Sequence, residues 1–325
     1  MNIVYRKAAL AASQGLSAAL VVVTDAAGHT PQVVGAKMLV YGDKQIEGTV
    51  GGGRFEFEVI ERASTMVNDE KPTLVMLQLG AELGMCCGGR MEVLITPIGT
   101  KNTWLSTVSE MLVQDNQVWL TTSLESDDLG VRNFGEGNYR LSGRRRYVGS
   151  AVITGEGGRR MLVERINKAS RLVLFGAGHV AQPTAHLAHM LGYQVVVIDD
   201  RPEWNSEERF PEASQRILEP YEDVLFDFES RPDDALLIVT RGHDFDQLIL
   251  ESVIGLEVAY LGMIGSDTKV KKAVKRLQAR GVNQEQTLHL HAPIGLSIGA
   301  LTPEEIAVSI VAEIVAVKRG EEMRS

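Results

Sequence analysis

The chain has 325 residues, of which 44% are hydrophobic and 23% charged, and its formal net charge at pH 7 is −9. This composition is typical of a soluble globular protein and argues against a disordered chain, while the negative charge argues against binding to nucleic acid or to an anionic membrane. The two cysteines, Cys86 and Cys87, are adjacent and offer no disulfide framework, so we expect a cytoplasmic protein.

The first part of the chain, to about residue 98, reads as a mixture of helices and strands. An apolar stretch near the N-terminus is predicted as a helix over residues 3–14, ended by Gly15, and a strand over residues 18–24, rather than as a secretory signal. No run is long enough to span a bilayer. Further strands are predicted at 36–41, 46–50, 73–79 and 91–96, with a turn at 25–29 and a helix at 54–67.

Residues 99–168 carry weaker patterns. They predict a helix near 105–112 and strands at 117–122 and 146–154. The basic run Arg144-Arg145-Arg146 is interpreted as a solvated face. We interpret this region as a strand-rich continuation of the first domain plus a linker, which predicts two domains, residues 1–168 and 169–325.

From Ser170 onward strands alternate with helices, which predicts a C-terminal Rossmann-like, doubly wound parallel sheet beside an N-terminal mixed α/β domain. A final helix begins after Thr302, with Pro303 at its first position. Parallel strands deliver their following loops to one edge of the sheet, so we expect several loops to converge on a crevice for a phosphate-bearing molecule. The strands that run into glycine-containing loops are 172–175, 236–239, 260–264 and 288–291.

The segment Gly176-Ala177-Gly178-His179-Val180-Ala181 fits the dinucleotide-binding fingerprint. Gly176 permits a tight turn, Gly178 lets a phosphate approach the backbone, and the following helix N-terminus would receive a pyrophosphate. Asp199 follows an apolar run about twenty residues later, where a carboxylate binds a ribose. The pattern favours a nucleotide-type ligand, with NAD as one candidate and an unused site as the alternative.

Three further polar residues fall at the same predicted edge. His179 and His243 each follow a glycine and either contact a ligand or cap helix ends. Ser266 opens another helix, where it could help to seat an anion. Asp246 is interpreted as a helix cap.

The first domain has two glycine-rich segments of its own. Gly51-Gly52-Gly53-Arg54 joins a strand to a helix, and its bare amides with one guanidinium suit an oxyanion, the alternative being a tight turn. Cys86 and Cys87 lie in a second segment, 84–90, where a thiolate could act as a nucleophile or a soft-metal ligand. The alternative is two buried small hydrophobic residues. A structural zinc site is not expected, because no second cysteine pair exists.

Taken together, these motifs resemble those of the XdhC/CoxI family, the accessory proteins of molybdenum hydroxylases such as xanthine dehydrogenase. The resemblance spans nearly the whole chain and is weakest over residues 100–168. It rests on residues 48–54, 86–89, 175–180, 199–202, 240–243, 262–266 and 291–305.

The resemblance implies a cytosolic protein that binds molybdenum cofactor, protects it, and supports its sulfuration and its insertion into an apo-hydroxylase. A cysteine desulfurase would be a second partner, and the protein would be a chaperone rather than a turnover enzyme. The acidic surface would allow a homodimer. The alternative is an NAD(P)-dependent oxidoreductase that uses the Rossmann-like domain.

Site residues follow from the resemblance by position. Cys86 and Cys87 become candidates for sulfur handling or for contact with the cofactor's molybdenum. The residues that would bind the cofactor or its nucleotide are Gly51, Gly52, Gly53, Arg54, Gly176, Gly178, His179, Asp199, His243 and Ser266.

Overall fold

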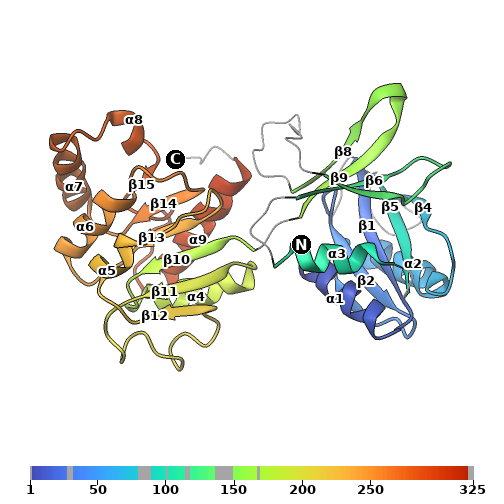
Figure 1. The fold of residues 1–325 in the computed structure, drawn as a ribbon, viewed down its shortest axis with the longest axis horizontal. Helices are drawn as coiled ribbons and strands as arrows, with labels where there is room; N and C mark the ends of the chain where they lie inside the picture. Colours follow the sequence, from blue (N-terminus) through green and yellow to red (C-terminus); the bar gives the residue numbers. More distant parts are fainter. Residues whose placement is uncertain are drawn as a thin grey trace. The chain divides into compact units, whose positions relative to one another are not determined.

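The computed structural model describes residues 2–27, 32–79, 89–99, 102–113, 118–135, 149–166 and 169–320 (Figure 1). These residues form two compact units, an N-terminal unit that ends at residue 166 and a C-terminal unit that starts at residue 169. Cys86, Cys87 and the basic run at 144–146 lie outside the described residues. In the described part of the chain, no helix combines the length and the apolar character that crossing a membrane requires.

The N-terminal unit is built on a five-stranded antiparallel sheet, sheet A, with the strand order β3-β2-β1-β5-β4. Alternate side chains of β1 serve two cores: Leu20 and Val22 pack with α1 and α3, and Val21 packs with α2. This arrangement confirms the predicted mixed α/β half. The elements are α1 (Asn2–Ser13), β1 (Ala18–Ala27), β2 (Lys37–Tyr41), β3 (Ile46–Gly48), α2 (Gly53–Met66), β4 (Thr73–Leu79), β5 (Gly89–Ile98) and α3 (Trp104–Met111).

A second antiparallel sheet, sheet B, completes this unit with the order β7-β6-β9-β8. Leu120 and Leu162 of sheet B share one core with Leu20 of sheet A, so the two sheets enclose apolar side chains between them. The strands are β6 (Val118–Ser123), β7 (Arg132–Gly135), β8 (Ser150–Thr154) and β9 (Arg160–Ile166), with a single 3-10 turn at Glu156–Gly158.

Several predicted boundaries in this unit differ from the structure: the strand predicted at 46–50 ends at Gly48, the strand predicted at 146–154 is β8 over Ser150–Thr154, and two further differences have a clear physical cause. The turn expected from Asp25 is strand as far as Ala27, because β1 keeps pairing with β5 up to Arg90. The strand predicted at 91–96 runs from Gly89 to Ile98 and therefore includes Pro97. The proline is tolerated there because the pairing of β5 with β4 has already ended at Ile95, so a missing N–H costs nothing on that side.

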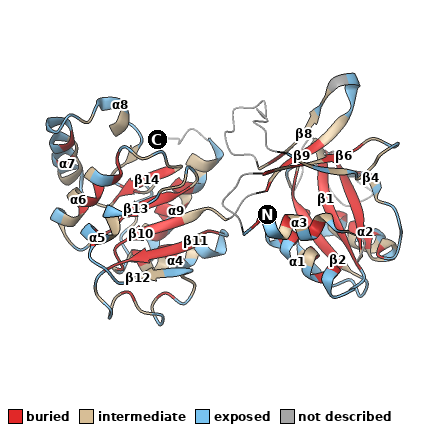
Figure 2. Cartoon of the chain, viewed as in Figure 1, coloured by how far each residue is buried: buried red, intermediate tan, exposed pale blue. Residues whose placement is uncertain are grey.

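The C-terminal unit holds a six-stranded sheet, sheet C, in which every pair is parallel and the order is β12-β11-β10-β13-β14-β15. Helices α4 and α9 pack on one face, and α5, α6 and α7 on the other (Figure 1). Its central strands are buried on both sides (Figure 2), which explains their unbroken apolar runs. The doubly wound prediction is confirmed.

The elements of this unit begin with β10 (Arg171–Phe175), α4 (Ala181–Met190), β11 (Gln194–Ile198), β12 (Gln215–Ile217), α5 (Tyr221–Phe226), β13 (Ala235–Ile238) and α6 (His243–Val253). They end with β14 (Tyr260–Met263), α7 (Asp267–Ala279), α8 (Gln284–Thr287), β15 (Leu290–His291) and α9 (Pro303–Arg319). Helix α9 starts with the predicted Thr302 cap, whose hydroxyl accepts from the amide of Glu305. The strand order reverses between β10 and β13: β11 and β12 lie on one side of β10, and β14 and β15 lie on the other side of β13. A ligand-binding crevice is therefore expected at the carboxyl ends of β10 and β13.

A buried ion pair ties α1 and sheet A to sheet B in the N-terminal unit. The Lys37 ammonium lies 2.6 Å from the Glu164 carboxylate, and the two side chains are only 3% and 2% exposed. The Tyr5 hydroxyl donates to the same carboxylate at 2.5 Å. Burial, followed by the charge of Glu164, raises the pKa of Tyr5 well above its ordinary value, so the phenol stays neutral and keeps donating.

We expect Lys37→Met to lower the free energy of unfolding of the N-terminal unit by about 3–5 kcal/mol, because Glu164 would be left charged and buried without its cation. The double variant Lys37→Met/Glu164→Gln should recover part of the loss. In a Trp204→Phe background both remaining tryptophans, Trp104 and Trp119, lie in this unit, so denaturant unfolding followed by their fluorescence reports on it. Equal stability of the single variant and the parent would contradict the expectation.

Candidate functional site

The turns after β10 and β13 cross each other closely at the switch point of sheet C. Gly176 has φ +117°, and a Cβ built on it would lie 2.5 Å from the carbonyl oxygen of Val239. No larger residue fits between these backbones, which is the role the sequence assigned to the first glycine. Gly178 differs, since a Cβ there would meet no atom within 4 Å. The space above the Gly178 backbone is therefore open to a ligand.

Asp199 at the end of β11 is fully buried, and its carboxylate accepts four hydrogen bonds. The amide of Ala177 donates at 2.9 Å, and Arg201 donates from its own amide and twice from its guanidinium. Burial alone raises the pKa of Asp199, but the hydrogen bonds from Arg201 and Ala177 outweigh it and hold the pKa below its ordinary value. In this structure the carboxylate holds the glycine turn in place, and contact with a ribose would require these donors to leave.

Arg209, in the segment between β11 and β12, is a residue of this edge that the sequence analysis missed. Its guanidinium donates to the carbonyl of Trp204 at 3.1 Å and to that of Ala177 at 3.4 Å, and lies 4.7 Å from the centre of the Trp204 ring. The His179 ring meets the same indole edge-on at 5.0 Å. An arginine in an irregular segment has no spacing signal, so only the folded chain reveals it.

The other cations of the edge are neutralised by carboxylates. Arg201 pairs with Asp199 at 2.8 Å, and Arg241 with Asp200 at 3.1 Å. Arg209 has no carboxylate within ion-pair distance among the described residues. It is thus an uncompensated positive charge beside the glycine turn and the start of α4, where an anion is favoured.

The remaining predicted residues of this edge take simpler positions. His243 is exposed at the first position of α6. Ser266 caps α7, since its hydroxyl accepts from the amide of Lys269. Asp246 does not cap backbone amides as interpreted from the sequence; it is buried and binds the Thr240 hydroxyl and the Lys269 ammonium. The structure brings His179 and His243 to the ends of neighbouring strands, β10 and β13.

The glycine turn of the N-terminal unit already holds an anion, the carboxylate of Glu56 on α2. That carboxylate accepts from the Thr49 hydroxyl and from the amides of Val50 and Gly52, at 2.9 and 3.2 Å for the amides. Burial raises the pKa of Glu56, but these hydrogen bonds outweigh it and lower the pKa overall. The turn does suit an oxyanion, and an external one would have to displace Glu56. Arg54 is exposed beside it.

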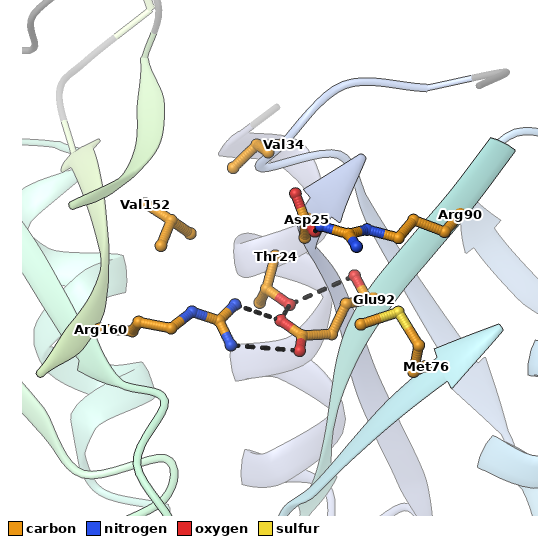
Figure 3. Close-up of a pocket in the computed structure, with 8 residues that line it drawn as sticks. All are labelled: Thr24, Asp25, Val34, Met76, Arg90, Glu92, Val152 and Arg160. Atoms are coloured by element: carbon orange, nitrogen blue, oxygen red, sulfur yellow. Dashed lines mark hydrogen bonds and ion pairs between the residues drawn. The ribbon is translucent and has the colours of Figure 1, made fainter. Parts of the chain in front are cut away.

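A cavity of about 510 Å³ lies in the N-terminal unit at the ends of β1 and β5 (Figure 3). No residue that the sequence analysis proposed for the site lines it. In the sequence, Cys87 precedes one of its lining residues, Arg90, by three positions. The described residues contain no group of three His, Cys, Asp or Glu side chains that could hold a metal ion. The lining residues are Thr24, Asp25, Val34, Met76, Arg90, Glu92, Val152 and Arg160.

Two family profiles match the chain. The one described as "XdhC Rossmann domain" matches residues 172–314, and the one described as "XdhC and CoxI family" matches residues 11–79. The first covers the whole glycine-loop edge of sheet C. The second covers the glycine turn at 51–53 and most of sheet A.

Relatives cover nearly the whole chain. An uncharacterised Escherichia coli protein, YqeB, is 30% identical over 98% of this chain, which spans 47% of the length of YqeB. A protein of Bacillus subtilis named as a probable subunit of xanthine dehydrogenase is 29% identical, with 93% of each chain covered. The E. coli molybdenum cofactor insertion chaperone PaoD is 22% identical over 98% of this chain and 89% of its own.

One solved structure shares the architecture of both units. The crystal structure of a xanthine dehydrogenase from Bacillus halodurans matches with a TM-score of 0.81 and 26% sequence identity, covering 99% of this chain and 97% of that one.

The two glycines of the turn after β10 should respond differently to alanine. Gly176→Ala should lower the free energy of unfolding of the C-terminal unit by about 2–4 kcal/mol, because the new Cβ meets backbone at a positive φ. Gly178→Ala should leave stability within about 0.5 kcal/mol, because the space there is open. In a Trp104→Phe/Trp119→Phe background, where Trp204 is the remaining tryptophan, denaturant unfolding followed by its fluorescence checks both. Equal losses would show that Gly178 is also required by packing.

The lowered pKa of Glu56 predicts a pH dependence. A carboxylate whose pKa falls on folding stabilises the folded state when the pH is above its pKa in the unfolded chain. That contribution is lost as the pH drops through its pKa in the folded state. At neutral pH we expect the parent protein to have a higher melting temperature than Glu56→Gln. The difference should shrink as the pH falls below 4.5, the ordinary pKa of glutamate. Thermal melting across that range is the measurement, and a pH-independent difference would contradict it.

Proposed function

Because the chain belongs to the XdhC and CoxI family, we propose that it is an accessory protein that binds molybdenum cofactor and delivers it to an apo-hydroxylase such as xanthine dehydrogenase. The names of two relatives support this role, one as a molybdenum cofactor insertion chaperone and one as a probable part of xanthine dehydrogenase. In this proposal the cofactor is cargo: the protein receives it, shields it, and passes it on.

The observation that carries the proposal is the anion-binding character of the edge of sheet C. Arg209 supplies an uncompensated cation there, and the backbone at Gly178 can be approached without a clash. The N-terminus of α4 adds its unpaired amides. Phosphate, at the end of the cofactor or in an attached nucleotide, is the group that such an edge binds, since guanidinium and amide donors match its oxygens.

A nicotinamide-dependent oxidoreductase is a weaker proposal. It relies on Asp199 to bind the ribose, and in this structure that carboxylate is occupied by Ala177 and Arg201. It also needs an acid or base beside the hydride, and the exposed His179 and His243 have no carboxylate partner among the described residues to orient them. Saturable binding of NAD, weakened in Asp199→Asn, would support it.

We further propose that Cys86 and Cys87 handle sulfur or contact the cofactor's molybdenum, in cooperation with a cysteine desulfurase. A thiolate can carry sulfur as a persulfide and is a soft ligand. Cys86→Ala and Cys87→Ala should therefore fold normally and activate the partner hydroxylase less well. Full activation by both variants would remove the thiols from the mechanism.

The proposed function is tested by purifying the protein from cells that make molybdenum cofactor and from cells in which its synthesis is blocked. We expect bound pterin and molybdenum from the first cells only, and activation of an apo-hydroxylase by that sample alone. Pterin-free protein from both sources would overturn the proposal.

The role of Arg209 has its own test. Arg209→Gln should bind the cofactor roughly tenfold more weakly, because a charge-assisted hydrogen bond to phosphate is lost. Arg280→Gln is the matched control, since Arg280 is an exposed arginine at the C-terminal end of α7 that pairs with Glu251. Equal binding by the two variants would exclude Arg209 from the site.

A further inference from the structure

The cavity of the N-terminal unit lies at the end of the apolar core between sheets A and B, where charged side chains replace apolar ones. Along β5 the side chains on the cavity side are Leu94 in the core, then Glu92, then Arg90. Alternation places all three on one face of the strand. An ion pair in such a place gives the fold little stability that apolar residues would not, and here two such pairs line a cavity.

A β-bulge directs two consecutive polar residues into this cavity. The pairing of β1 with β5 shifts between Val23 and Asp25, so that Thr24 is the extra residue and Asp25 opposes Glu92. In a regular strand neighbouring side chains point to opposite faces, whereas here Thr24 and Asp25 both line the cavity. Bulges of this kind re-aim side chains next to binding sites.

Two arginine–carboxylate pairs line the cavity, and both keep unused hydrogen-bonding capacity (Figure 3). Glu92 is 5% exposed; one of its oxygens accepts from Thr24 at 2.7 Å and from Arg160 at 2.6 Å, while the other has only a 3.3 Å contact with Arg160. Arg90, 60% exposed, contacts Asp25 at 3.3 Å through one nitrogen. The cavity thus presents acceptors and donors side by side.

The charges of the lining select the chemistry of the ligand. Two arginines and two carboxylates sum to zero, which disfavours a polyanion such as a phosphate chain. A neutral ring with adjacent donor and acceptor edges fits better, since carboxylates accept from ring amino groups and guanidinium groups donate to ring carbonyl and nitrogen acceptors. Val34, Val152 and Met76 supply apolar contacts for the faces of such a ring.

We propose that this cavity binds a fused amino-oxo pyrimidine ring system, and, resting on the proposed function, that this ring system is the pterin of the cofactor. The cavity volume of about 510 Å³ lies within the roughly 300–1,000 Å³ of small-molecule sites. The glutamate and aspartate of the lining accept from the amino edge, and Arg90 and Arg160 donate to the oxo edge.

The test is calorimetric titration of the full-length protein with neopterin, a pterin that carries neither phosphate nor molybdenum. We expect saturable binding that weakens about tenfold or more in Arg90→Gln, from the lost charged donor, and in Val34→Phe, which fills the cavity. The matched controls are Arg159→Gln and Val33→Phe. Arg159 pairs instead with Asp127 and Asp128, and Val33 is exposed and does not line the cavity.

Three results would overturn the inference in whole or in part. No saturable binding of neopterin, or equal binding by the cavity and control variants, would remove the ring site. Guanosine binding as tightly as neopterin would keep a site for a fused amino-oxo pyrimidine and remove its assignment to the pterin. Circular dichroism of each variant confirms that it is folded, and the exposed side chain of Arg90 makes Arg90→Gln the variant that folding losses affect least.

The inference and the proposed function can fail separately. Neopterin bound by a protein that never acquires cofactor in cells would end the proposed function and keep the cavity site. Cofactor carried equally well by Arg90→Gln, Val34→Phe and the parent would end the cavity inference and keep the function. Arg209→Gln should leave neopterin binding unchanged, because that arginine belongs to the C-terminal unit.

Discussion

The edge of sheet C where β10, β11 and β13 end is held together by the buried carboxylate of Asp199. A buried charge must be paired and hydrogen-bonded, and here the partners are the glycine turn after β10 and the arginine that follows β11. Arg241, after β13, reaches the neighbouring Asp200. The loops around the open space at Gly178 are therefore ordered by ion pairs of the chain itself, and a ligand entering there has less ordering to bring about.

A second buried carboxylate plays a similar part on the other side of the same edge. Glu313 on α9 accepts from the Tyr260 hydroxyl and from the amide of Gly295, and lies 3.4 Å from His291. Burial raises the pKa of Glu313, but the hydrogen bonds from His291, Tyr260 and Gly295 lower it overall. The long loop after β15 is thus attached to α9.

The two units offer contrasting chemistry. The edge of sheet C offers positive charge and open backbone, the means of holding phosphate. The cavity beside the bulge at Thr24 offers paired charges that sum to zero, the means of recognising a polar ring.

Sequence patterns were enough to predict the doubly wound sheet, the N-terminal α/β half and the glycine turns, because unbroken apolar runs, helix caps and the glycines at 176 and 178 reflect local backbone requirements. Its motifs also pointed to the family. Which charged side chains lack an ionic partner could be seen only in the folded chain. Asp199 and Asp246 bind groups from distant parts of the chain, the Glu56 carboxylate occupies its own glycine turn, and Arg209 meets no carboxylate among the described residues. Which charges find partners in this way depends on packing that no spacing encodes. The sequence did not predict the cavity either, since it is lined from six separate segments of the chain and depends on a single bulge in β1.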